Sequence, residues 1–92
     1  MADREAWLKA LARVAEGHDE VGSGPCPVCG RHRLQLRYIV ETSSRVGYAL
    51  FWCDACLHGI RVSRARAPEG FWTWPLDDPA SVAGVPDFTR DD

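Results

Sequence analysis

Apolar residues recur along the chain at two different spacings, and each spacing predicts an element. In residues 4–16 the apolar side chains fall three and four positions apart, which is the repeat of one face of an amphipathic helix. Asp3 is placed to cap its start and Gly17 to end it. So short a helix is marginal alone in water, so its apolar face is expected to pack on the rest of the chain. That face comprises Trp7, Leu8, Leu11, Val14 and Ala15.

An alternation of apolar and polar residues begins at residue 33 and is interrupted only by Ile39. In "RLQLRYIV" the even-numbered positions are apolar from Leu34 to Val40, which is typical of a half-buried strand. The turn residues of "ETSSRVG" follow, then a second apolar run, "YALFWC", and a third alternating run, "GIRVSR". These segments predict three short antiparallel strands within residues 25–66.

The last segment, residues 67–92, shows neither repeat and contains four of the six prolines. It is expected to be extended and to lie along the rest of the molecule. At 92 residues the chain has room for one compact domain with a modest core, which a metal or disulfides would help to stabilise. The predicted fold is a small α+β domain over residues 1–92, with a helix, a three-stranded antiparallel sheet and an extended C-terminal strap.

Four cysteines, which can bind a metal or form disulfides, occur as two pairs of identical spacing. Cys26 and Cys29 precede the first strand, and Cys53 and Cys56 follow the second after 23 intervening residues. Two residues between cysteines let the backbone curl so that both sulfurs point at one centre, and the hairpin brings the second pair back to the first. No secretory signal or bilayer-length apolar run is evident, so a cytoplasmic protein is expected, where paired thiols bind metal more often than they form disulfides.

The residues "CPVCG" at 26–30 and "CDAC" at 53–56, with a hairpin between them and a strand after them, resemble the zinc ribbon family. The resemblance covers residues 25 to about 66 and implies one Zn²⁺ per chain, bound by Cys26, Cys29, Cys53 and Cys56. One departure lies in the second pair, because Leu57 and His58 precede Gly59 where the first pair is followed directly by Gly30.

Three alternatives to a zinc site are compatible with the four cysteines. Iron bound by four thiolates, as in the rubredoxin family, uses similar pairs. A redox dithiol favours a single pair beside a β-α-β unit, and two disulfides need an oxidising compartment. His32 and His58 lie beside the pairs, where they are expected to orient or shield the site rather than to bind the metal. With four protein ligands the site has no open position, so a structural role and no enzymatic activity are expected.

Charge is distributed unevenly along the chain. Residues 22–67 have a net charge of +5, between segments of −2 before them and −5 after them. Arginines on strands beside aromatic rings can contact phosphates and stack bases, so nucleic-acid binding is one hypothesis. Its candidate contacts are Arg33, Arg37, Arg61 and Arg64, with Tyr38, Tyr48, Phe51 and Trp52 as candidate stacking platforms.

The C-terminal segment carries a second candidate surface in "GFWTWPLDD". Trp72 and Trp74 are large aromatic residues on a stretch interrupted by proline, and such residues are common interface anchors. They are equally suited to cover the open face of the small sheet. Because a zinc bound by four thiolates adds a charge of about −2 and the chain is already acidic, protein interaction is the favoured hypothesis and nucleic-acid binding the alternative.

Overall fold

The computed structural model describes residues 4–17 and 24–91. Asp3 and most of the polar linker, residues 18–23, lie outside the described residues. One α-helix, α1 (Arg4–Ala15), precedes a three-stranded antiparallel meander formed by β1 (Leu34–Val40), β2 (Val46–Cys53) and β3 (His58–Arg66). Within the described ranges there is no helix with the length and apolar character needed to cross a membrane.

The C-terminal segment adds two short strands, which the sequence did not predict. β4 (Thr73–Pro75) pairs in parallel with β1, and β5 (Thr89–Arg90) pairs in parallel with β3. The sheet is therefore five-stranded and mixed, in the order β4-β1-β2-β3-β5, rather than three-stranded and antiparallel. Strands of two and three residues are too short to show alternation, so only the return of the chain to each sheet edge reveals them.

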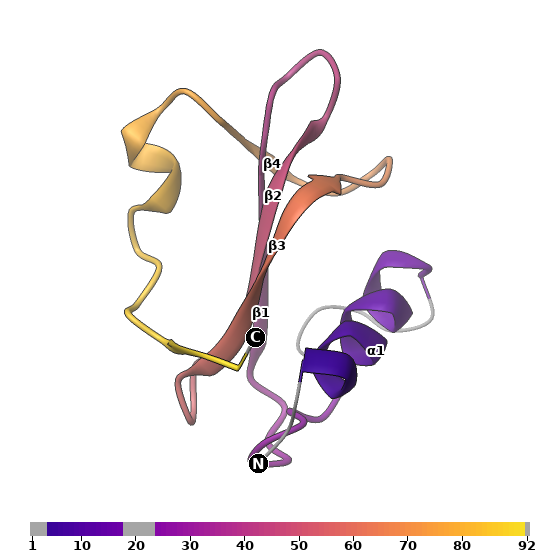
Figure 1. Cartoon of the computed structure of the whole chain (residues 1–92), viewed down its shortest axis with the longest axis vertical. Coiled ribbons are helices and arrows are strands. Elements are labelled where there is room, and N and C mark those ends of the chain that lie inside the picture. Colours follow the sequence, from indigo (N-terminus) through magenta and orange to yellow (C-terminus); the bar gives the residue numbers. More distant parts are fainter. Residues whose placement is uncertain (1–3, 18–23, 92) are drawn as a thin grey trace.

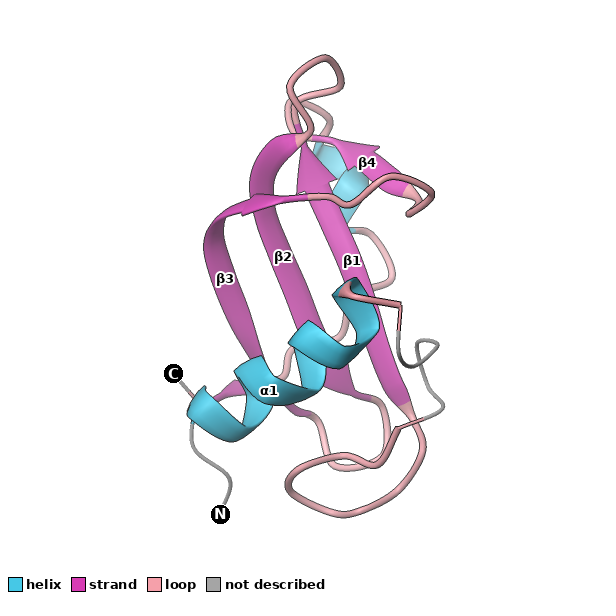
Figure 2. Cartoon of the chain, turned by 90° about the vertical axis from the view of Figure 1, so that its right-hand side faces the viewer, coloured by secondary structure: helices cyan, strands magenta, loops and turns pink. Residues whose placement is uncertain are grey.

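The sheet lies between two covering layers (Figure 1). On one face α1 crosses the strands (Figure 2), with Trp7 packed edge-on against Phe51 at 5.6 Å between ring centroids. On the other face the C-terminal segment, which includes the 3₁₀ turn η1 (Pro79–Val82), packs over Ile39, Leu50 and Trp52. Both faces of the central strand are thus covered, which explains why β2 is buried continuously from Ala49 to Cys53.

The helix follows the predicted apolar repeat with one exception. Trp7, Leu11 and Val14 are buried, but Leu8 is exposed at the edge of the stripe. Gly17 ends the helical region with a φ of +81°, a conformation that glycine adopts without steric cost.

The turn between β1 and β2 fixes the register of the hairpin. The Glu41 carboxylate accepts hydrogen bonds from the backbone N–H groups of Ser43 and Ser44, at 3.2 and 2.7 Å. Hydrogen bonds from the Ser43 hydroxyl and these backbone groups lower the pKa of Glu41 to about 2. The turn places Val40 opposite Gly47 and, at the far end of the hairpin, Leu34 opposite Cys53.

Asp91 ties the C-terminus to both the helix and the sheet. Its Oδ2 accepts a hydrogen bond of 2.9 Å from the indole N–H of Trp7, and its Oδ1 lies 2.9 Å from Nδ1 of His58. Its backbone N–H donates to the carbonyl of Gly59 at 2.8 Å. One carboxylate therefore joins α1, β3 and the end of the chain.

Replacing Asp91 with alanine should lower the free energy of unfolding by about 1–3 kcal/mol, because the fully buried Trp7 indole N–H then loses its acceptor. Urea unfolding followed by tryptophan fluorescence measures the change. Asp77→Ala, at an exposed position of the same segment, is the control and should change stability by less than about 0.5 kcal/mol. Equal effects of the two substitutions would contradict this role of Asp91.

Candidate metal centre

The four cysteines meet at one end of the sheet. Cys26 and Cys29 lie in the turn before β1, Cys53 is the last residue of β2, and Cys56 lies in the turn before β3. All four sulfur atoms lie within 4.8 Å of one another, as the paired spacing predicted. Residues separated by as many as 30 positions are thus brought to one centre.

The first cysteine turn is closed by its own backbone. The N–H of Val28 donates to the sulfur of Cys26 at 3.3 Å, and the N–H of Gly30 donates to the Cys26 carbonyl at 2.9 Å. Gly30 has a φ of +78°, which lets the chain leave the turn without a clash. N–H groups aimed at sulfur stabilise the thiolate form that a metal requires.

The second turn repeats the first with a leucine in the place of the glycine. The N–H of Ala55 donates to the Cys53 sulfur at 3.4 Å, and the N–H of Leu57 donates to the Cys53 carbonyl at 2.9 Å. Leu57 adopts the left-handed conformation with a φ of +56°. Gly59 serves a different purpose, because a Cβ there would lie 2.7 Å from the Cα of Trp52 on the paired strand.

The sulfur separations match a tetrahedral metal site. Two pairs, Cys26 with Cys56 and Cys29 with Cys53, are each 3.7 Å apart. Four sulfurs placed about 2.3 Å from a central metal at the vertices of a regular tetrahedron are about 3.8 Å apart. A disulfide needs about 2.05 Å, and all four cysteines are free thiols. The cluster is therefore compatible with a zinc site and does not contain disulfides.

The pKa values of three cysteine thiols are shifted, and the shifts differ in direction. Burial raises the pKa of the Cys56 thiol to about 12 and also raises the pKa of Cys26. The backbone N–H of Arg31 lowers the pKa of the exposed Cys29 thiol to about 7. Burying several thiolates together is unfavourable without a compensating charge, and a divalent cation supplies that charge.

The histidine beside the second pair does not join the sulfur cluster. His58 turns Nδ1 to the carboxylate of Asp91, and the metal-type cluster found among residues 4–17 and 24–91 consists of the four cysteines alone. Asp91, which the sequence did not single out, orients this imidazole from the far end of the chain.

The four candidate nucleic-acid arginines have different environments. Arg37 places its guanidinium 4.5 Å above the Trp74 ring and donates from one nitrogen to the carbonyls of Ser81 and Ala83, at 2.8 Å each. Arg61 lies over the ring of Tyr48 at 4.5 Å. Arg33 and Arg64 are exposed, and Arg64 has a φ of +54° where the pairing of β2 and β3 shifts register.

Three of the four expected stacking platforms are unavailable to a ligand. Tyr38, Phe51 and Trp52 are buried, and Trp52 instead stacks on Phe88 at 5.8 Å with an interplanar angle of 9°. The expectation that these rings stack bases was therefore wrong. The physical reason is that α1 and the C-terminal segment cover both sheet faces, which the alternation of β1 alone did not indicate.

The two tryptophans of the C-terminal segment differ in their exposure to solvent. Trp74 is half-buried against the sheet, whereas Trp72 is 76% exposed. Their rings lie edge-to-face with centroids 6.3 Å apart. The pairing of β4 with β1 brings this tryptophan pair beside Arg37, so one candidate partner surface and one candidate nucleic-acid residue lie together.

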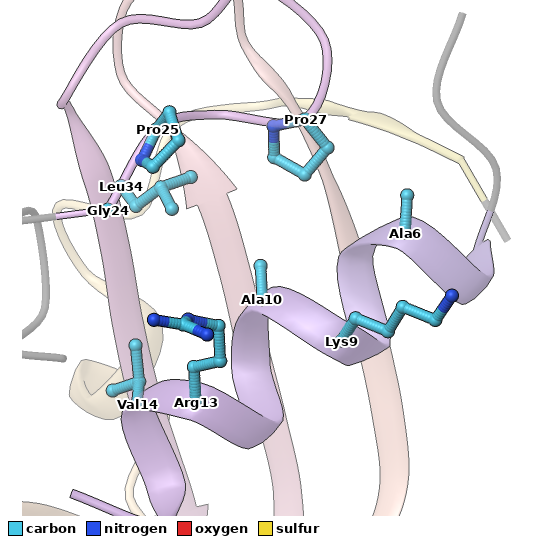
Figure 3. A pocket seen from close by; sticks show the side chains of 9 residues that line it. All are labelled: Ala6, Lys9, Ala10, Arg13, Val14, Gly24, Pro25, Pro27 and Leu34. Carbon is cyan, nitrogen blue, oxygen red and sulfur yellow. The ribbon is translucent and has the colours of Figure 1, made fainter. Parts of the chain in front are cut away.

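A hollow of about 480 Å³ lies between α1 and the first cysteine turn (Figure 3). Its walls are mainly apolar, and the side chains of Lys9 and Arg13 lie one turn apart along the helix that borders it. The nine residues that line it are Ala6, Lys9, Ala10, Arg13, Val14, Gly24, Pro25, Pro27 and Leu34.

Comparison of the chain with protein-family models, with curated proteins and with solved structures gives no match. The chemistry of the site therefore follows from its own residues. Four free thiols within 4.8 Å of one another, on two turns with matching hydrogen bonds, are suited to binding one metal ion.

The left-handed conformation of Leu57 predicts an unusual order of stabilities. Because φ > 0 costs a residue with a Cβ about 1–2 kcal/mol, and a β-branched residue more, unfolding at a fixed metal concentration should rank Leu57→Gly at or above the wild type and Leu57→Val below it. Val46→Gly, at the exposed start of β2 and outside the set of residues with positive φ, is the control and should lose about 1 kcal/mol. A Leu57→Val variant as stable as Leu57→Gly would contradict this account.

Proposed function

We propose that the chain is a non-enzymatic zinc-binding module, with a zinc ribbon over residues 25–66 that holds one structural Zn²⁺. The observation that carries the proposal is the 3.7 Å separation within the two sulfur pairs, which a tetrahedral Zn–S₄ site requires. The matching hydrogen bonds of the two cysteine turns support it. A reducing compartment such as the cytoplasm suits four unpaired thiols.

A zinc ion in this position has a structural role. Cys26, Cys29, Cys53 and Cys56 supply four ligands, so no coordination position is left for water or substrate. The ion joins the turn before β1 to the turn before β3, and it thereby closes the open end of the meander. In so small a domain the free energy of metal binding is a large part of the free energy of folding.

Protein purified without added metal should contain one zinc per chain by elemental mass spectrometry, and all four thiols should react once a chelator has removed the metal. Cys53→Ser should lose both the metal and the fold, because it removes a ligand from a fully buried position. Ala55→Ser, in the same turn, is the control and should keep both. Iron in place of zinc would replace the metal assignment, and metal-free folded protein would refute the site.

The module binds a protein partner through the surface formed by Trp72 and Trp74. In support, Trp72 exposes three quarters of its surface, although the domain has few large side chains for its own core. The surface is also rigid, because Arg37 lies over Trp74 and is anchored to two carbonyls of the C-terminal segment. A pre-organised aromatic surface loses little entropy on binding, which favours an interface anchor.

Nucleic-acid binding is the second candidate. The exposed side chains of Arg33 and Arg64 favour it, because they remain accessible to phosphate groups. The burial of Tyr38, Phe51 and Trp52 weakens it, and so do the internal contacts of Arg37. Trp72 is then the remaining large aromatic platform that is well exposed.

Parallel co-purifications with the wild type, Trp72→Ala and the control Leu76→Ala should separate the two candidates. A protein retained by the wild type and the control but lost with Trp72→Ala, and then bound directly when purified, is the expected result. Leu76 is exposed in the same segment, so it matches Trp72 in position but not in ring chemistry. Micromolar binding of single-stranded or duplex nucleic acid that falls steeply with salt would instead favour the alternative.

A further inference from the structure

The four cysteines are not equally protected from solvent. Cys53 is fully buried and Cys26 is 3% exposed, while Cys56 is half-buried in the turn before β3. Cys29 is the exposed member of the cluster. A small reagent arriving from solvent therefore meets Cys29 first.

The surroundings of Cys29 also favour reaction there. Cys29 is the exposed cysteine of the first turn, so a reagent reaches it without a change in the fold. The sulfur of Cys53 lies 3.7 Å away, close enough to act as a second nucleophile after a small displacement. The site thus pairs an accessible cysteine with a protected neighbour.

We propose that Cys29 is a modification site at which hydroperoxides and soft electrophiles attack the metal centre and release the ion. The inference rests on the proposed zinc site and extends it to a specific reactive ligand. The other three cysteines react only after Cys29 has been modified, because its loss opens the cluster.

The reaction with a peroxide balances as follows. The Cys29 thiolate attacks one oxygen of hydrogen peroxide, the O–O bond breaks, hydroxide leaves, and a sulfenic acid forms on Cys29. The Cys53 thiolate then attacks that sulfur, the S–O bond breaks, a second hydroxide leaves, and a disulfide forms. Two thiolates are oxidised and one peroxide is reduced. Cys29 and Cys53, once joined in the disulfide, would no longer hold a zinc ion.

The first test uses the wild-type protein after its zinc content has been measured. Substoichiometric iodoacetamide, or peroxide with dimedone as a sulfenic-acid trap, is followed by peptide mass mapping and by a colorimetric chelator for released zinc. Cys29 should be labelled at least about 10-fold faster than any other cysteine, and one zinc should be released for each Cys29 modified. Without the trap, the disulfide should include Cys29.

Two ligand replacements sharpen the test, because histidine can also bind zinc. Cys29→His should keep the metal and slow its release by peroxide at least about 10-fold, whereas the matched control Cys56→His should keep the wild-type rate. If either variant fails to bind zinc, the mapping on the wild type still decides the question. Initial labelling at Cys26, Cys53 or Cys56, or zinc retained after Cys29 is modified, would overturn this inference alone. Protein that never binds zinc would overturn the proposed function as well.

Discussion

The register of the first hairpin is the constraint on which the rest of the structure depends. Cys53 stands opposite Leu34, so the end of β2 meets the first cysteine turn at the start of β1. Because side chains alternate across a strand, a slip of one residue would turn Cys53 to the other face and separate it from Cys29. The turn held by Glu41, at the far end of the hairpin, is what sets this register. The four sulfurs therefore lie within 4.8 Å of one another only when the whole hairpin is paired in this register.

The features that were predictable from the sequence depend on near neighbours in the chain. The helix follows from a three-and-four repeat, the meander from alternation, and the sulfur cluster from two short cysteine pairs around a hairpin. What was missed depends on distant residues: Asp91 meets Trp7 across 84 positions, and Arg37 meets Ser81 across 44. Strands β4 and β5 exist only because the C-terminal segment returns to each sheet edge, so no local pattern announces them. The same return buries Trp52, whose role as a stacking platform had been inferred from its place among arginine-rich strands.

The second cysteine turn has the same backbone shape as the first, although it lacks the glycine that follows the first pair. A glycine usually marks the left-handed residue after a cysteine pair, and its absence here left the shape of the turn undetermined. Leu57 adopts that conformation despite its Cβ, and the surrounding hydrogen bonds, including Leu57 N–H to the Cys53 carbonyl at 2.9 Å, hold it there. Gly59, two positions later, is needed because β3 approaches Trp52 too closely for any side chain. The left-handed conformation and the close approach of the strands therefore fall on two different residues, Leu57 and Gly59.

The C-terminal segment connects the two ends of the sheet. At one end β4 holds the Trp72 and Trp74 surface beside Arg37. At the other end, Thr89 and Asp91 donate backbone hydrogen bonds to Leu57 and Gly59, the residues that follow the last cysteine. Through Asp91 the same end also holds Trp7 of α1. Both covering layers are therefore attached next to the second cysteine turn. A metal ion bound by the four cysteines would order this turn, and it would thereby also stabilise the attachment of the helix and of the segment that carries the exposed tryptophan.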